Sequence, residues 1–234
     1  YAVVYLDDQF GRPFAQQMTN RLAAPEVAEI LERPFPTDAT PEELAEFATR
    51  LAESGPRTIV LIADAERGWA MLQALATVFP VDPPFILVND ALRSPPSTEI
   101  VADLPEEFRN AIVGLSPTVP PVVPPEPPGA YATNSLDCLN LIALAAVEAG
   151  TDDPAAIAEE MLNVSVVGSL CNSFRQCRGI AEQDRNINYQ GANAIDFSER
   201  GDPARGRISS FSFDVTGLAI AGAPAPLTEI TESD

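Results

Sequence analysis

The sequence predicts an α/β fold in which a parallel sheet carries helices on both faces. Apolar runs of strand length alternate with amphipathic stretches of helix length through the first half of the chain. Runs such as residues 57–63 (RTIVLIA) are apolar almost throughout, which is typical of strands covered on both faces. Strands and helices that alternate at short intervals favour parallel pairing.

The predicted elements follow one another closely up to residue 116. We expect strands over residues 2–6, 26–35, 57–63, 84–90 and 111–116. Helices are expected between them, over residues 13–24, 41–54 and 66–79. The second helix has the clearest start, because Thr40 is a suitable N-cap, Pro41 suits the first helical position and Glu43 completes a capping box.

The second half has a different character. Proline dominates residues 117–131 (PTVPPVVPPEPPGAY), which predicts a stiff, extended linker. A long apolar helix up to Gly150 and a helix capped by Asp153 should follow, with a helical pattern continuing to Ile187. Residues 194–213 predict two short strands around a Gly-Asp-Pro turn. These helices need a sheet to cover, and the second half supplies too little of one. Either they pack on the first half of the chain, or their sheet is encoded upstream of Tyr1.

The charge of the chain excludes several classes of function. Its formal net charge is −20, which disfavours nucleic acid, DNA included, and anionic membranes as partners. All basic residues are arginine, since the sequence has neither Lys nor His. Ser-His-Asp and Cys-His nucleophiles, Schiff-base lysines and His-ligated metals are therefore excluded. Only catalysis by paired carboxylates stays open, so we expect no enzyme and no cofactor.

The three cysteines point away from a metal site. Cys171 and Cys177 have five residues between them in GSLCNSFRQCRGI, which fits no standard zinc spacing. A small local disulfide is the natural alternative, and it would imply an oxidising compartment. Cys138 lies within the long apolar helix, where we expect it to act as a small hydrophobic residue.

Acidic residues follow three of the predicted strands. Asp7 and Asp8 come after the first strand, Asp64 after the third and Asp90 after the fourth. Ligands of open parallel sheets bind outside the carboxyl ends of the strands, so these residues should gather along one edge.

Three segments together resemble one protein family. Residues 2–18 (AVVYLDDQFGRPFAQQM) resemble the strand, turn and helix that open the second lobe of type I periplasmic binding proteins, the solute receptors of branched-chain amino acid ABC importers. Residues 130–161 are similar to the family's long helix after the hinge crossing. The cysteine pair followed by YQGA and DF…GDP resembles actinomycete-like members, and the likeness covers nearly the whole chain.

The resemblance implies two α/β lobes of the periplasmic binding protein-like type I fold, joined by hinge strands around a ligand cleft. The implied divisions are a ligand-binding lobe (1–116), a Pro-rich hinge crossover (117–130), a helical part of the other lobe (131–205), and a returning strand with a polar tail (206–234). That other lobe, with its helices and hairpin, is incomplete here. Residues upstream of Tyr1 are expected to complete it.

The resemblance also suggests ligand-binding residues. The cleft aromatic falls on Phe10, where relatives often have Tyr, and the next loop falls on Asp64 and Glu66, where amino acid receptors often carry an aromatic residue. The acidic partner of an α-ammonium falls nearest Asp90. Alternatively, Asp64 and Asp90 cap helices. Under this resemblance Cys171 and Cys177 form a structural disulfide, and residues 196–203 (DFSERGDP) form a hairpin turn rather than a calcium loop.

We therefore expect an extracytoplasmic receptor, periplasmic or lipid-anchored at the cell surface, that binds an amino acid or amide-like solute and delivers it to an ABC permease. Three alternatives stay open. They are the extracellular sensor domain of a signalling receptor, an α/β enzyme that uses carboxylates, and a structural or assembly fragment.

Overall fold

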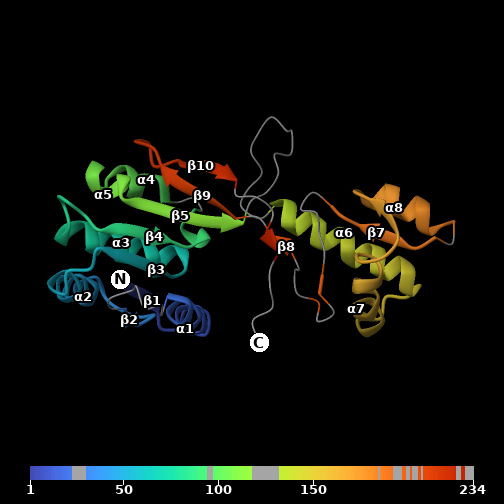
Figure 1. Ribbon diagram of the computed structural model, residues 1–234, viewed down its shortest axis with the longest axis horizontal. Helices are drawn as coiled ribbons and strands as arrows, with labels where there is room; N and C mark the ends of the chain where they lie inside the picture. The colour runs from blue at the N-terminus through green and yellow to red at the C-terminus, as the bar shows by residue number, and fades with distance from the viewer. Residues whose placement is uncertain are drawn as a thin grey trace. The chain divides into compact units, whose positions relative to one another are not determined.

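The computed structural model describes residues 1–22, 30–93, 97–117, 132–183, 185–191, 197–198, 201, 205–206, 208–224 and 228–229. The chain divides into two compact units (Figure 1). The first unit comprises Tyr1–Ser116 and Ser209–Pro224, and the second comprises Pro117–Ile208 and Ala225–Asp234. Among the described residues, no helix is long and apolar enough to cross a membrane.

The first unit alternates strands and helices as the sequence predicts. Its elements are β1 (Ala2–Leu6), α1 (Gly11–Leu22), β2 (Leu31–Phe35), α2 (Pro41–Glu53), β3 (Thr58–Ile62), α3 (Ala65–Val78), β4 (Phe85–Val88), the 3₁₀ helix η1 (Asp90–Arg93), α4 (Ser97–Ala102), α5 (Glu106–Asn110) and β5 (Ile112–Pro117), then β9 (Ile208–Phe213) and β10 (Ala219–Pro224). The predicted strands and the three longer helices are confirmed, although of the strand expected over 26–35 only Leu31–Phe35 is a strand and residues 26–29 lie outside the described residues. The short helices η1, α4 and α5 were not predicted, because helices of one or two turns leave no periodic pattern.

The strands form one seven-stranded sheet in the order β10-β9-β5-β4-β3-β1-β2. The pairs β1–β2, β1–β3, β3–β4 and β4–β5 are parallel, and β9–β10 is antiparallel. From β1 the chain first moves outward to β2, and it then crosses back to β3 and continues to β4 and β5. The direction of winding therefore reverses between β1 and β3, and such a switch point is where open α/β sheets bind ligands.

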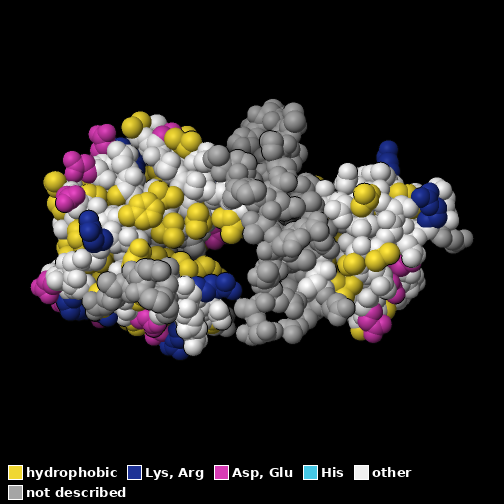
Figure 2. All heavy atoms as spheres, viewed as in Figure 1, with side chains coloured by type: hydrophobic (Ala, Val, Ile, Leu, Met, Phe, Trp, Pro, Cys, Tyr) yellow, Lys and Arg dark blue, Asp and Glu magenta, His cyan; other side chains and the backbone are white. Residues whose placement is uncertain are grey.

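Both faces of the sheet carry apolar side chains. On one face Trp69 of α3 is 3% exposed and packs edge-on against Phe213 of β9, with ring centroids 5.4 Å apart. The prediction that Trp69 belongs to the core is confirmed. On the other face, Ala15 of α1 packs against the residues of β1 and β3. Leu115 of β5 and Ile220 of β10 stay exposed, and Figure 2 shows hydrophobic side chains on the surface of this unit.

Helix α2 begins as its sequence requires. The Thr40 hydroxyl accepts a hydrogen bond from the Glu43 amide (3.3 Å), and the Glu43 carboxylate accepts one from the Thr40 amide (2.8 Å). The predicted capping box is confirmed. These bonds satisfy two backbone donors that the first turn of a helix leaves without partners.

Gly114 makes room for an aromatic side chain of the returning strand β9. The ring of Phe211, 1% exposed, occupies the space into which a Cβ at Gly114 would point. Because Gly114 lies on β5 and Phe211 on β9, the glycine allows the two neighbouring strands to bury an aromatic ring between sheet and helices.

The second unit is mostly helical. It contains α6 (Ala132–Ala149), α7 (Pro154–Asn163), β6 (Ser169–Cys171), α8 (Phe174–Ala181), β7 (Ile187–Tyr189), β8 (Arg205–Gly206) and β11 (Thr228–Glu229). Gly150 has a φ of 62° after α6, and the Asp153 carboxylate accepts hydrogen bonds from Ala155 N (2.9 Å) and Ala156 N (3.2 Å) at the start of α7. Both predicted helix ends are confirmed.

One prediction about the second half needs correction, and two concern residues that are mostly outside the described part of the chain. The helical pattern to Ile187 holds only for α8, because β6 and β7 flank it as a parallel pair. The Pro-rich linker was predicted over 117–131, but Pro117 is the last residue of β5. Residues 118–131 and most of the predicted Gly-Asp-Pro turn lie outside the described residues. The strand expected after that turn is β9, and its described hairpin partner is β10.

The cysteines divide into a buried pair and an exposed thiol. Cys171 and Cys177 form a disulfide between β6 and α8, and both are buried, so this prediction is confirmed. Cys138 lies in the apolar helix α6, as predicted, and its thiol is free and exposed. It lies beside the apolar surface of α6 that the described residues leave open.

A buried polar network joins α6 to β7. Asp137 is 3% exposed and accepts a hydrogen bond from the Tyr189 hydroxyl (2.7 Å), which itself accepts one from the Asn140 amide (2.8 Å). Burial, followed by the bond to Asp137, raises the pKa of Tyr189 from 10.0 to about 12.

Replacing Tyr189 with Phe should change how stability depends on alkaline pH. Between pH 10.0 and about 12 the folded state keeps the phenol proton that the unfolded state has lost, so this contribution is complete below pH 10.0 and declines as pH rises. Urea unfolding at several pH values should show Tyr189→Phe less stable at neutral pH, with a difference from wild type that shrinks in this range. A constant difference would contradict the network.

Candidate ligand-binding site

The predicted site residues follow the carboxyl ends of adjacent strands. Neighbouring parallel strands end at the same edge, so the loops after β1, β3 and β4 lie side by side, on both sides of the switch point. Phe10 belongs to the first loop, Asp64 and Glu66 to the second and Asp90 to the third. We call these three loops the carboxyl edge.

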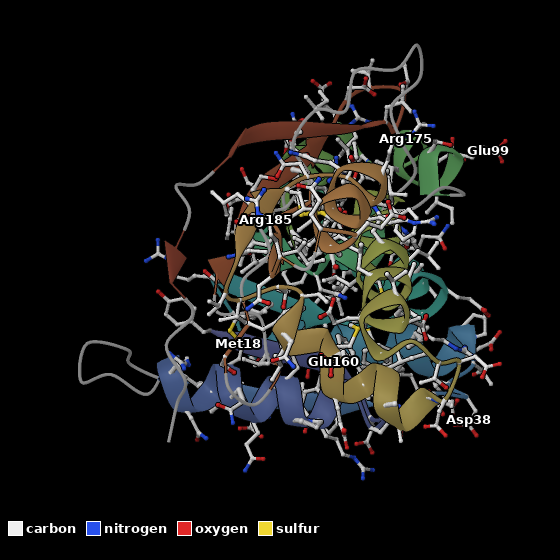
Figure 3. The ribbon with its side chains drawn as sticks, turned by 90° about the vertical axis from the view of Figure 1, so that its right-hand side faces the viewer. Met18, Asp38, Glu99, Glu160, Arg175 and Arg185 are labelled. Carbon is white, nitrogen blue, oxygen red and sulfur yellow. A yellow bond between two sulfur atoms is a disulfide. The ribbon has the colours of Figure 1, made fainter. Side chains whose placement is uncertain are left out.

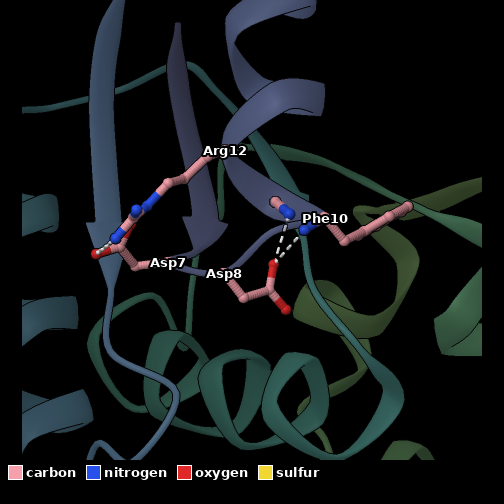
Figure 4. Close-up of polar contacts among 5 residues, drawn as sticks. Asp7, Asp8, Phe10 and Arg12 are labelled. Carbon is pink, nitrogen blue, oxygen red and sulfur yellow. Dashed lines mark hydrogen bonds and ion pairs between the residues drawn. The ribbon is translucent and has the colours of Figure 1, made fainter.

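The loop after β1 is held by its own aspartate. Asp8 Oδ1 accepts hydrogen bonds from Phe10 N (2.9 Å) and Gly11 N (2.6 Å), as Figure 4 shows. Gly11 approaches the Leu6 carbonyl so closely that no Cβ fits there. The turn leaves Phe10 51% exposed, with its ring 5.8 Å from that of Phe14. An exposed aromatic ring on a fixed turn is available for an apolar contact.

Asp7 has a different role. Its carboxylate forms an ion pair with Arg12, in which Nη2 lies 3.0 Å from Oδ2 (Figure 4). The hydrogen bond from Arg12 holds the pKa of Asp7 below its ordinary value. The Asp7 amide donates to the Phe35 carbonyl at the end of β2 (2.9 Å). Asp7 therefore links the ends of β1 and β2 rather than contributing an unpaired charge.

The loop after β3 supplies two exposed carboxylates. Asp64 is the N-cap of α3, since its Oδ1 accepts a hydrogen bond from Arg67 N (2.8 Å). Glu66 lies in the first turn of the same helix. The alternative considered for Asp64, helix capping, is therefore present in the structure. The capping hydrogen bond leaves the Asp64 carboxylate exposed at the edge. A contact between Asp64 and a ligand stays a prediction.

The loop after β4 is tied to the loop after β3. The Asn89 side chain donates from Nδ2 to the Ala63 carbonyl (3.0 Å) and accepts through Oδ1 from the Ala63 amide (3.2 Å). The half-buried Asp90 follows at the start of η1. Sequence reasoning concentrated on Asp90 and missed Asn89, although a carboxamide at the end of an apolar strand was visible as a signal.

Sequence reasoning also missed Arg93. Its Nη1 donates to Ser116 Oγ at the end of β5 (3.1 Å), and its guanidinium lies 6.0 Å from the centroid of the Phe211 ring. Arg93 thereby connects η1 to β5 and β9. These contacts join segments far apart in the sequence, so no local pattern could have indicated them.

A cavity of about 500 Å³ lies elsewhere, in the second unit. It is lined by the ends of α6 and α7 and the start of β7, and Figure 3 labels one lining residue, Glu160. None of the predicted site residues lines it. Among the described residues, no group of three His, Cys, Asp or Glu side chains could hold a metal ion.

Comparison of the sequence with protein-family models and with curated proteins gives no match. The structure, however, matches solved proteins. The leucine-binding protein LivK of Thermotoga maritima matches with a TM-score of 0.64 and 15% identity, over 95% of this chain and 60% of that one. LivJ of Streptococcus pneumoniae is a branched-chain amino acid transporter substrate-binding protein solved with isoleucine. It matches with a TM-score of 0.62 and 12% identity, over 98% of this chain and 60% of LivJ.

A third match has a different named ligand. The fatty acid ABC transporter substrate-binding protein of Thermomonospora curvata matches with a TM-score of 0.58 and 14% identity, over 94% of this chain and 55% of that one. All three are named as binding proteins, in agreement with the prediction of a non-catalytic chain. The chain has the fold of type I periplasmic binding proteins and spans about 60% of the length of the first two.

Replacing Asp8 with Ala should loosen the first loop of the carboxyl edge. The change removes the acceptor of two backbone hydrogen bonds, and loss of such a cap costs about 1 kcal/mol. Chemical denaturation should show this loss for Asp8→Ala and only a few tenths for Asp8→Asn, which keeps an acceptor oxygen. Equal losses for both variants would assign the effect to charge instead.

Proposed function

We propose that the chain forms part of the solute-binding receptor of an ABC importer, and that the carboxyl edge of its first unit contacts an amino acid or a small amide-like solute. The observation that supports this most is the position of Phe10, Asp64 and Asp90 on three adjacent loops around the switch point. An apolar ring and carboxylates at one edge suit a ligand with a hydrocarbon side chain and an ammonium group.

Asp90 is the proposed partner of the ammonium. It is half-buried, and a carboxylate there gains a charge-assisted hydrogen bond that contributes about 1.5–3 kcal/mol and penalises solutes without a cation. Phe10 would contact the side chain of the ligand, since its ring is exposed at the neighbouring loop.

The charge of the edge favours an amino acid over a fatty acid. The fold alone does not distinguish these two ligand classes, because the matched structures include one protein named for leucine and one named for fatty acids. Asp64 and Glu66 are exposed and add negative charge beside Asp90. A ligand whose only charge is a carboxylate would be repelled by these groups, whereas an ammonium would be attracted.

The proposed receptor works by differential binding. A solute that contacts both lobes stabilises the closed form, so the population shifts toward closure and the permease recognises that form. We place the protein outside the cytoplasm, and the Cys171–Cys177 disulfide supports an oxidising compartment.

Replacing Asp90 with Asn should weaken amino acid binding. Calorimetric titration of the protein expressed from its complete reading frame, with leucine, isoleucine and asparagine, should show binding of at least one. Loss of the charge-assisted bond predicts an affinity about 10- to 100-fold lower for Asp90→Asn.

Asp103→Asn is the matched control, because Asp103 is an exposed acid after α4 that belongs to none of the three loops of the carboxyl edge, and should leave affinity unchanged. Equal affinities for the Asp90 variant and wild type, or no binding of any of the three amino acids, would refute the proposal.

A further inference from the structure

Arg93 is a half-buried cation at the carboxyl edge. It ends η1, the helix that follows β4, and its Nη1 donates a hydrogen bond to the buried Ser116 Oγ near the end of β5 (3.1 Å). Strands β4 and β5 pair in parallel, so both end at this edge of the sheet (Figure 1). Arg93 therefore lies beside the loop that carries Asp90.

The guanidinium of Arg93 has no carboxylate partner in the described part of the chain. The ion pairs found there belong to Arg12, Arg50 and Arg178, although the chain has 34 acidic residues against 14 arginines. A charge that leaves water without a counter-ion is costly. A half-buried cation at a ligand-binding edge therefore suits a ligand that brings a negative group.

Another half-buried arginine, Arg67, is engaged elsewhere. Its Nη1 donates to the Ala39 carbonyl in the loop after β2 (3.1 Å). Strand β2 is separated from β4 by β1 and β3, so Arg67 reaches away from Asp90 and from the end of β5. Arg93 is thus the arginine that the topology brings next to Asp90.

The contacts of Arg93 hold its guanidinium in place without using all of its donors. The Phe211 ring lies 6.0 Å from the guanidinium, and the Ser116 hydroxyl accepts from one N–H. A guanidinium has five N–H groups in one plane, and stacking on a ring covers a face of that plane rather than its N–H groups. The remaining N–H groups suit two parallel hydrogen bonds to a carboxylate.

Asp90 and Arg93 lie within one turn of η1. Residues three apart in a 3₁₀ helix are on the same side of it and about 6 Å apart along its axis. The proposed partner of the ammonium and a cation are therefore neighbours. An α-amino acid carries its ammonium and its carboxylate on one carbon atom, so one ligand can contact both residues.

We infer that Arg93 binds the carboxylate of the ligand, so that the site selects zwitterionic α-amino acids over amines and amides without a carboxylate. The inference rests on the proposed function and narrows its ligand class. A fatty acid gains the contact with Arg93 but meets the more numerous carboxylates of the carboxyl edge, so it stays the poorer ligand.

Comparison of each amino acid with its own α-amide tests the role of Arg93. Calorimetric titration uses the protein expressed from its complete reading frame, with leucine, isoleucine and asparagine and with the α-amide of each. At about pH 6 both forms carry the ammonium, because an α-amino group next to an amide has a pKa of about 7.7–8.0. They differ in the carboxylate, so the wild type should prefer the amino acid about 10- to 100-fold.

Arg93→Gln should abolish this preference. The affinity for the amino acid should fall about 10- to 100-fold, while the affinity for the amide changes less than about threefold. Arg93→Lys keeps the charge and loses the planar fork, so it should retain part of the preference, and it replaces Arg93→Gln if that variant does not fold. Arg57→Gln is the matched control, because Arg57 is exposed and precedes β3 at the opposite edge of the sheet, and it should leave the preference unchanged.

A purely structural role of Arg93 gives a different result. Loss of the bond to Ser116 would then weaken binding of the amino acid and of the amide equally, and this unchanged preference would overturn the inference. A wild type that binds both forms equally well would also overturn it.

The proposed function fails in a different way. Asp90→Asn should weaken binding of both forms, because both carry the ammonium. If that result is obtained and the preference survives Arg93→Gln, only the inference fails. If Asp90→Asn changes neither affinity while Arg93→Gln abolishes the preference, only the ammonium partner is wrong. Absence of binding by all three amino acids would overturn both.

Discussion

The parallel pairing of β1 with both β2 and β3 is the constraint on which the first unit depends. Parallel neighbours require crossover connections, so helices must cover the sheet, and the loops that follow the parallel strands β1 to β5 must emerge at one edge. Because the winding reverses between β1 and β3, the connections after these two adjacent strands lead away in opposite directions along the sheet. The candidate site therefore results from the topology before any side chain is considered.

Short polar contacts fix the loops that this topology brings together. Asp8 binds the amides of its own turn, and Asn89 binds both backbone groups of Ala63 across 26 positions of sequence. Such contacts order the loops in advance, which reduces the conformational entropy that a ligand would have to remove. The Asp7–Arg12 pair ties β1 to α1 and leaves the acids of the later loops to set the charge of the edge.

Local patterns predicted what local interactions decide. The capping box of Thr40 and Glu43, the cap at Asp153 and the turn at Gly150 each involve residues within one helical turn. Tertiary contacts were beyond such patterns, as Arg93 and its bond to Ser116 show. The three-residue strands β6 and β7 were too short for periodicity to reveal. The exposure of Cys138 was also beyond them, because an apolar helix does not indicate which of its sides is covered.

The central claim is that the loops after β1, β3 and β4 contact the solute. Amide signals of the protein from its complete reading frame, recorded by nuclear magnetic resonance during addition of isoleucine, test it most directly. The account predicts that the signals of Phe10, Gly11, Asp64 and Asp90 shift together and saturate, while that of Asp103 stays in place. Shifts confined to residues around the cavity of the second unit, such as Val166 and Asn186, would contradict it.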